Sequence, residues 1–312
     1  MSFVKKLIGE HKPPPEWADF FSGEEYEAFL GLIHAYFQTQ KTNISIQDGV
    51  LTVQEDGRQF GLQNLAQVCH MNDRKSWREN IKTHFDNIMK SESEQQELER
   101  KIDDFSEIRE LLAVRIWPSD YLVKFDPPNI IYRQDMEGTV SVLAFDLPSS
   151  TVTVAADKAV HWNKDTRELF EIGLQYVRSK AIPNTTVENV GENLQITLLS
   201  GDSFYIATHA LLLGEHPKCV GSHGSIVAIP HRHVVLCYPI EDINVVHAVN
   251  RLMPIVQGMY HEGPGSISPY LYWYNGSDYT NLPYTIEDKQ LQFRPPESFV
   301  ELLNGLAEST QK

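Results

Sequence analysis

The chain has 312 residues and a formal net charge of −15, with 41% apolar and 22% charged residues. This composition is ordinary for a globular protein and excludes a disordered chain. The acidity is spread evenly, because residues 1–110 carry 13 Lys and Arg against 20 Asp and Glu, and residues 111–312 carry 14 against 22. Without a basic cluster to neutralise a phosphate backbone, we expect no nucleic-acid partner.

The three cysteines, Cys69, Cys219 and Cys237, lie far apart in the sequence and form no CxxC pair. That usage is typical of a reducing compartment and not of a disulfide scaffold. The N-terminus has no apolar core of signal-peptide length, and no apolar run approaches the ~20 residues that a spanning helix needs. We therefore expect a cytoplasmic protein that does not engage a membrane.

The first part of the chain begins with a helix at Glu24–Gln38, for which Ser22 is a suitable N-cap. A hairpin follows, because Asp48-Gly49 lies between two short β-rich runs. Two helices are predicted at residues 60–69 and 76–89, and residues 91–109 form the most charged stretch of the chain. This pattern predicts an N-terminal extension with one helix (1–40), a small module of hairpin and helices with a charged linker (41–105), and a main domain (106–312).

In the main domain, short β-rich runs come in pairs that are separated by helical patterns. A helix at Asp165–Lys180 has Asp165 and Glu168 at capping-box spacing. A second helix starts at Asp242, and Pro254 should kink it or split it in two. Strands are expected at residues 111–117, 130–132, 140–145, 186–190, 194–199, 226–229, 234–238, 268–274 and 278–282.

The apolar runs at 226–229 and 234–238 flank the turn Pro230–His233 and read as a hairpin buried on both faces, which is typical of the centre of a sheet. The whole pattern predicts an α+β fold with a largely antiparallel sheet, paired strands separated by helices, and a small N-terminal α/β module.

The tract 209–233 holds the sharpest candidates for chemistry. Five residues with imidazole or thiol side chains, the groups that Zn²⁺ prefers, are candidate metal ligands: His216, Cys219, His223, His231 and His233. The alternative is that they are turn and core residues, because their spacing matches no full zinc pattern. The sequence also has no nucleophile elbow and no phosphate-binding glycine loop.

A row of aromatic residues marks the hairpin that closes the main domain. These residues are candidate partner-binding side chains, since Tyr and Trp are enriched as anchors in protein interfaces: Tyr270, Tyr272, Trp273 and Tyr274. The alternative is that the row stabilises the hairpin through cross-strand packing.

Several short motifs resemble the YtpQ-like bacterial proteins over roughly residues 42–285. In the main domain they are Arg115–Pro118 after a strand, Ala144–Pro148, Asp202–Phe204 at the start of a helix, and Val227–His233. In the first part, Phe60–Ala66, Trp77 and His84-Phe85 look similar to longer relatives of that group. The resemblance implies a cytosolic protein, and it carries no activity, cofactor or site residue.

The leading functional hypothesis from the sequence is a non-catalytic binding module that engages another protein. It depends on the absent catalytic signatures and on the sparsely charged region 181–288, where three Lys and Arg face ten acidic residues. The first alternative is a metal-dependent hydrolase that uses zinc held by the tract 209–233. The second is a small-ligand sensor with a pocket beside the hairpin at 226–238.

Overall fold

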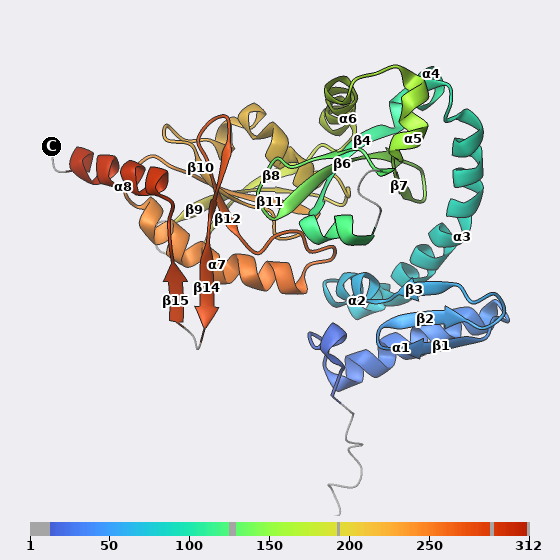
Figure 1. The fold of residues 1–312 in the computed structure, drawn as a ribbon. Helices are drawn as coiled ribbons and strands as arrows, with labels where there is room; N and C mark the ends of the chain where they lie inside the picture. The colour runs from blue at the N-terminus through green and yellow to red at the C-terminus, as the bar shows by residue number, and fades with distance from the viewer. Residues whose placement is uncertain (1–12, 125–128, 192–193, 288–289, 311–312) are drawn as a thin grey trace, which may run out of the picture. The chain divides into compact units, whose positions relative to one another are not determined.

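The computed structural model describes residues 13–124, 129–191, 194–287 and 290–310. In these ranges every pair of neighbouring strands is antiparallel, and helices separate the pairs. The predicted α+β class is therefore confirmed (Figure 1). The same ranges contain no helix with both the length and the apolar character that crossing a membrane requires.

Contacts within the chain define two compact units. The first comprises residues 1–90 with 262–264, and the second comprises residues 91–261 with 265–312. The first unit contains η2 (Glu16–Ala18), α1 (Gly23–Thr39), β1 (Ile44–Gln47), β2 (Val50–Val53), β3 (Gln59–Gly61), α2 (Gln63–His70), η3 (Arg74–Ser76) and the start of α3 (Trp77–Lys101).

The first unit is built around α1 and the hairpin of β1 and β2. Ser22 accepts a hydrogen bond from the Glu25 backbone and Glu25 returns one to the Ser22 backbone, so a capping box fixes the start of α1. Phe29 of α1 is fully buried with Leu51 of β2 and Trp77 of α3 in one core. The helix of the expected extension 1–40 thus shares its core with the hairpin and helices that follow. Residues 59–61 form a strand, where the sequence pattern predicted the start of a helix.

The second unit contains two larger sheets. The smaller of these has the strand order β4-β6-β5, with β7 also paired to β6. Its strands and neighbouring helices are α4 (Phe105–Ile108), η4 (Arg109–Leu111), β4 (Leu112–Pro118), η5 (Ser119–Lys124), β5 (Tyr132–Arg133), β6 (Thr139–Asp146), β7 (Thr151–Thr153), α5 (Ala156–Ala159), η7 (Val160–Trp162) and α6 (Thr166–Lys180).

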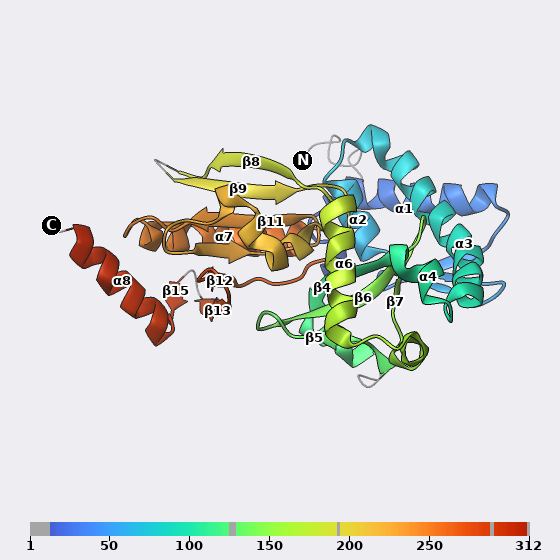
Figure 2. The same ribbon diagram turned by 90° about the horizontal axis from the view of Figure 1, so that it is seen from above.

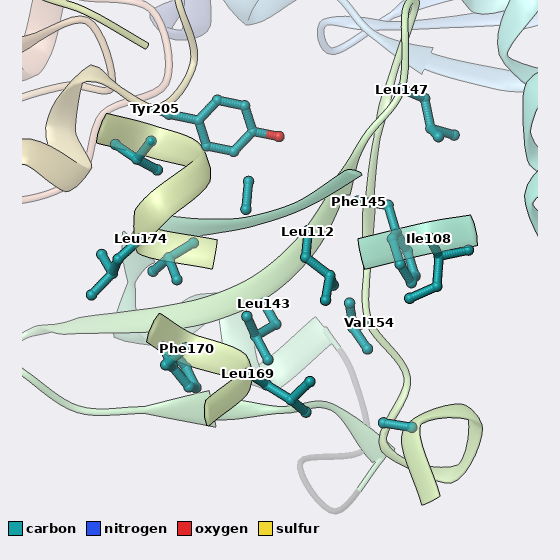
Figure 3. Packing of buried hydrophobic residues seen from close by; sticks show 14 of the residues in the cluster. Ile108, Leu112, Leu143, Phe145, Leu147, Val154, Leu169, Phe170, Leu174 and Tyr205 are labelled. Atoms are coloured by element: carbon teal, nitrogen blue, oxygen red, sulfur yellow. The ribbon is translucent and has the colours of Figure 1, made fainter. Parts of the chain in front are cut away.

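Helix α6 packs on β4 at very short range, and Figures 2 and 3 show it across one face of this sheet. Gly173 makes the approach feasible, because a Cβ atom there would lie 2.9 Å from Val114 Cγ2 and 3.0 Å from the Ala113 carbonyl carbon. Phe145 of β6 and Phe170 of α6 fill the core between them.

The larger sheet has six strands in the order β13-β12-β10-β11-β9-β8. The predicted buried hairpin is its centre, as expected from its apolar runs. The elements are β8 (Asn184–Asn189), β9 (Gln195–Ser200), η8 (Ile206–Glu215), η9 (Pro217–Cys219), β10 (Ser225–Ala228), β11 (Val234–Pro239), α7 (Val245–Glu262), β12 (Leu271–Tyr274) and β13 (Tyr279–Leu282). Beyond them lie β14 (Tyr284–Glu287), β15 (Gln290–Phe293) and α8 (Glu297–Thr310), where β14 and β15 form a hairpin that the sequence analysis did not anticipate.

The two faces of the six-stranded sheet are covered by different elements. Ile226 and Ala228 point to the face that packs with α7 and α8, whereas Val227 packs in a separate cluster with η8 and η9. Helix α7 continues through Pro254 without splitting. The segment expected as a regular helix after Asp202 is a 3₁₀ helix with a kink at Leu212.

Candidate functional site

The structure separates the five candidate metal ligands into different surroundings. Cys219 is buried as a free thiol and forms a hydrogen bond with the thiol of Cys237. His216 pairs with His209, at 3.0 Å between Nε2 and Nδ1. In the part of the chain that the structure describes, no three His, Cys, Asp or Glu side chains gather where they could hold a metal ion.

The aromatic residues of the closing hairpin pack mainly inside the second unit. Tyr272 is fully buried and donates a hydrogen bond to the Glu137 carbonyl at 2.8 Å, and Tyr274 is 8% exposed. Trp273 is half-buried, contacts Phe299 of α8 and donates a hydrogen bond to the His223 carbonyl. Tyr270 is also half-buried. Two of the four candidate partner-binding side chains, Tyr272 and Tyr274, are therefore buried residues of the second unit.

Two arginines and one phenylalanine from three separate segments form a cluster in the second unit. Arg115 comes from the middle of β4, Phe204 from the connection between β9 and η8, and Arg232 from the turn between β10 and β11. The guanidinium carbon of Arg232 lies 4.4 Å from the Phe204 ring centroid, and that of Arg115 lies 5.4 Å from it. Both cations thus converge on one aromatic ring. We call Arg115, Phe204 and Arg232 the arginine cluster.

Aromatic stacking extends the arginine cluster along β4. The Arg115 guanidinium carbon lies 3.9 Å from the Trp117 ring centroid, and Trp117 stacks on Tyr121 with 4.3 Å between centroids and 9° between planes. Stacking of a cation on an aromatic face contributes about 0.5–2 kcal/mol, depending on desolvation. These contacts hold the guanidinium plane of Arg115 while leaving its edge unpaired.

The backbone around the cluster fixes Arg232 from both sides. Its N–H donates to the Gly265 carbonyl at 3.1 Å, and its carbonyl accepts from the Ala207 N–H at 3.1 Å. Gly265 has φ of +72°, and a Cβ atom there would lie 2.9 Å from Arg232 Cδ. A glycine is therefore required at 265 both by the backbone conformation and by the closeness of the arginine.

Neither arginine of the cluster has an acidic partner among the described residues. Five other arginines there form ion pairs with carboxylates, namely Arg58, Arg74, Arg109, Arg133 and Arg178. Arg115 is only 6% exposed, and its buried Nε has no hydrogen-bond partner. Burial lowers its pKa to about 10, and burial together with the repulsion from Arg115 lowers the pKa of Arg232 to about 10. A buried cation without a counter-charge is costly and is frequently a functional group.

The two histidines beside the cluster are neutral in this geometry. His233 shares its Nδ1 proton with the Gly201 carbonyl at 3.0 Å, so its Nε2 is free to accept the hydrogen bond from Arg232 Nε at 2.9 Å. His231 accepts a hydrogen bond from the His233 backbone at Nδ1. Burial, and then the nearby charges, lower the pKa of each histidine to about 4. His231 and His233 therefore add hydrogen-bonding atoms to the site and no charge.

Asp146, a half-buried carboxylate that acts on Arg115, already accepts hydrogen bonds from two tyrosines. Asp146 accepts hydrogen bonds from Tyr176 at 2.5 Å and from Tyr205 at 3.0 Å, one on each oxygen. Burial raises the pKa of both hydroxyl groups, and their bonds to Asp146 raise it further. Asp146 favours the charged form of Arg115 electrostatically without forming an ion pair with it.

A separate depression of about 680 Å³ is lined by Asn189, Gly191, Gln195 and Tyr238. Its lining is polar and uncharged. None of these four residues carries a charge that would select an ionic ligand. The arginine cluster does carry such a charge.

Comparison of the chain with protein-family models, with curated proteins and with solved structures finds no match. The resemblance to YtpQ-like proteins thus stays a prediction from short motifs.

Arg115, Phe204 and Arg232 were named from the sequence only within motifs of the resemblance, and no role was predicted for them, although the neighbouring His231 and His233 were candidate metal ligands. A usable signal was present in the pattern of charges. Arg115 is the one charged residue in the apolar run 111–117, and Arg232 is one of three cations in the region 181–288. A single cation in an apolar strand needs an anionic or hydrogen-bonding partner, either from the protein itself or from a bound ligand.

Proposed function

We propose that the protein binds a small anionic ligand, and that Arg115 and Arg232 hold the anionic group. This is the small-ligand alternative of the sequence analysis, with a site beside the central hairpin of β10 and β11. The observation that carries it is that two guanidinium groups converge on Phe204 without a carboxylate partner. Arginine is the residue best suited to pair with carboxylate or phosphate groups, because its planar fork matches their oxygens.

The burial of the cluster also supports a ligand site over a purely structural role. A structural cation is normally satisfied by the protein, as in Arg178, which pairs with Glu171 and Glu215. Arg115 has aromatic faces on its plane but an unsatisfied Nε at its edge. A bound oxyanion would supply hydrogen-bond acceptors and a counter-charge in one step.

The test is a thermal-shift titration with acetate, benzoate, sulfate, inorganic phosphate and phenyl phosphate at constant ionic strength. We expect at least one of these anions to raise the melting temperature of the wild-type protein and to have no such effect on the Arg115→Met, Arg232→Met double variant. Arg178→Met is the matched control, because it removes a guanidinium that already has carboxylate partners. Equal shifts in the wild type and the double variant, or no shift with any anion, would refute the proposal.

A further inference from the structure

The guanidinium groups of Arg115 and Arg232 both have N–H donors that form no hydrogen bond with the described residues. Arg232 uses its Nε on His233, and the side chain of Arg115 forms no hydrogen bond with any described residue. The terminal Nη groups of both arginines are therefore not used by the described residues. Each guanidinium can present two parallel N–H donors to an oxyanion.

The positive charge of the two guanidinium groups is not balanced by an ion pair with any described residue, although Asp146 acts on Arg115 and Asp202 on His233 electrostatically. Asp146 directs both of its oxygens to tyrosines, and the adjacent His231 and His233 are neutral. The two guanidinium groups share the neighbourhood of one ring, so each raises the cost of keeping the other charged. An anion with two negative charges would relieve this repulsion more completely than one with a single charge.

We infer that the ligand presents a tetrahedral dianion of the phosphate or sulfate type, which bridges Arg115 and Arg232. This inference rests on the proposed function and narrows it to a class of ligand. A carboxylate has two oxygens in one plane and one charge, so it pairs side by side with one guanidinium. A phosphoryl group has at least three oxygens that point in different directions and carries about two charges, so it can accept from two arginines at once.

Phe204 indicates where the rest of a phosphate ester would lie. Its side chain is 41% exposed although it forms the centre of the arginine cluster. An apolar or aromatic group attached to the phosphate can cover this exposed part and gain from its burial. A free phosphate ion would leave it uncovered, so the two sources of the same dianion should differ in affinity.

The experiment is isothermal titration calorimetry on the full chain at about pH 8, where a phosphate monoester is dianionic. Phenyl phosphate and benzoate form the decisive pair, because both attach an anionic group to the same ring. We expect phenyl phosphate to bind at least about 10-fold more tightly than benzoate, and sulfate to bind more tightly than acetate. Tighter binding of phenyl phosphate than of inorganic phosphate would identify an ester as the natural form, and equal binding would identify the free anion.

The outcomes separate this inference from the proposed function. If benzoate binds as tightly as phenyl phosphate in an Arg115-dependent manner, the proposed function stands and the dianion is wrong. If no anion of either class binds, both are wrong. The single variants Arg115→Met and Arg232→Met should each weaken phenyl phosphate binding by about 10-fold or more, because charge-assisted hydrogen bonds are lost. Calorimetric melting of each variant verifies that it is folded, and an undiminished affinity in a folded variant would overturn the bridging arrangement.

Discussion

Replacing Arg115 by methionine should stabilise the protein while weakening anion binding. Burial lowers the pKa of Arg115 to about 10, well below its ordinary value. Each pKa unit corresponds to about 1.4 kcal/mol, so keeping this charge in the folded protein costs about 3 kcal/mol. The contact with Trp117 offsets about 1–2 kcal/mol of that cost. Methionine keeps most of the apolar stem and carries no charge, so we expect a net gain of about 1 kcal/mol.

Differential scanning calorimetry of the full chain is the suitable assay, because two compact units can melt in separate transitions. A gain of about 1 kcal/mol in a unit of this size should raise the melting temperature of the second unit by about 2–4 °C. The control Arg178→Met removes a guanidinium that is bonded to Glu171 and Glu215, and it should lower or leave unchanged the same transition. A loss of more than about 1 kcal/mol in Arg115→Met would show that the arginine is a structural cation, and the argument for a ligand site would fail.

Three further predictions follow from the surroundings of the site. The pKa of His231 falls to about 4 on folding, so between about pH 6.5 and 4 the unfolded chain binds a proton that the folded chain does not. The free energy of unfolding should therefore decrease by up to about 3 kcal/mol as the pH is lowered from 6.5 to 4, and calorimetry of His231→Asn should show a smaller decrease. Gly265→Ala should weaken sulfate binding in calorimetric titrations by displacing Arg232, whereas Gly258→Ala in α7, where a Cβ meets nothing within 4 Å, should leave it unchanged. Gly173→Ala should destabilise the second unit by about 1–3 kcal/mol in denaturant titrations, despite the better helix propensity of alanine, because its Cβ collides with β4; a neutral or stabilising effect would contradict the packing described.

Local signals in the sequence predicted much of the fold because they act over a few residues. The capping residues of α1 and α6 and the turn at Asp48-Gly49 are found where the pattern placed them. The central position of β10 and β11 followed from strands that are apolar on both faces. Features that depend on tertiary contacts escaped prediction. Pro254 was expected to kink or split its helix. Helix α7 runs through it as one helix, and Met253 and Val256 beside it are buried in the cluster that packs on the sheet.

The candidate site escaped prediction for a related reason. Histidines and aromatic residues drew attention because of their chemistry and spacing, yet packing against their own unit explains Tyr272, and His216 is paired with His209. Arg115 and Arg232 are candidate ligand-binding residues because they lack ion-pair partners among the described residues, and the absence of a tertiary contact cannot be read from a sequence. Only the assembled strands and turns bring both to Phe204, where neither forms an ion pair with an acidic side chain of the described residues.

The acidity of the chain makes the unpaired arginines more informative. With 42 Asp and Glu against 27 Lys and Arg, carboxylates are abundant, and five arginines elsewhere in the described ranges pair with them. At the cluster, Asp146 is near enough to influence Arg115 electrostatically, but Tyr176 and Tyr205 hold both of its oxygens. Asp146 therefore acts on Arg115 from a distance and forms no ion pair with it. An acidic surface repels anions in general, so an external anion would be retained only where paired guanidinium groups offer directed hydrogen bonds. We therefore expect the proposed site to select a specific oxyanion over bulk anions.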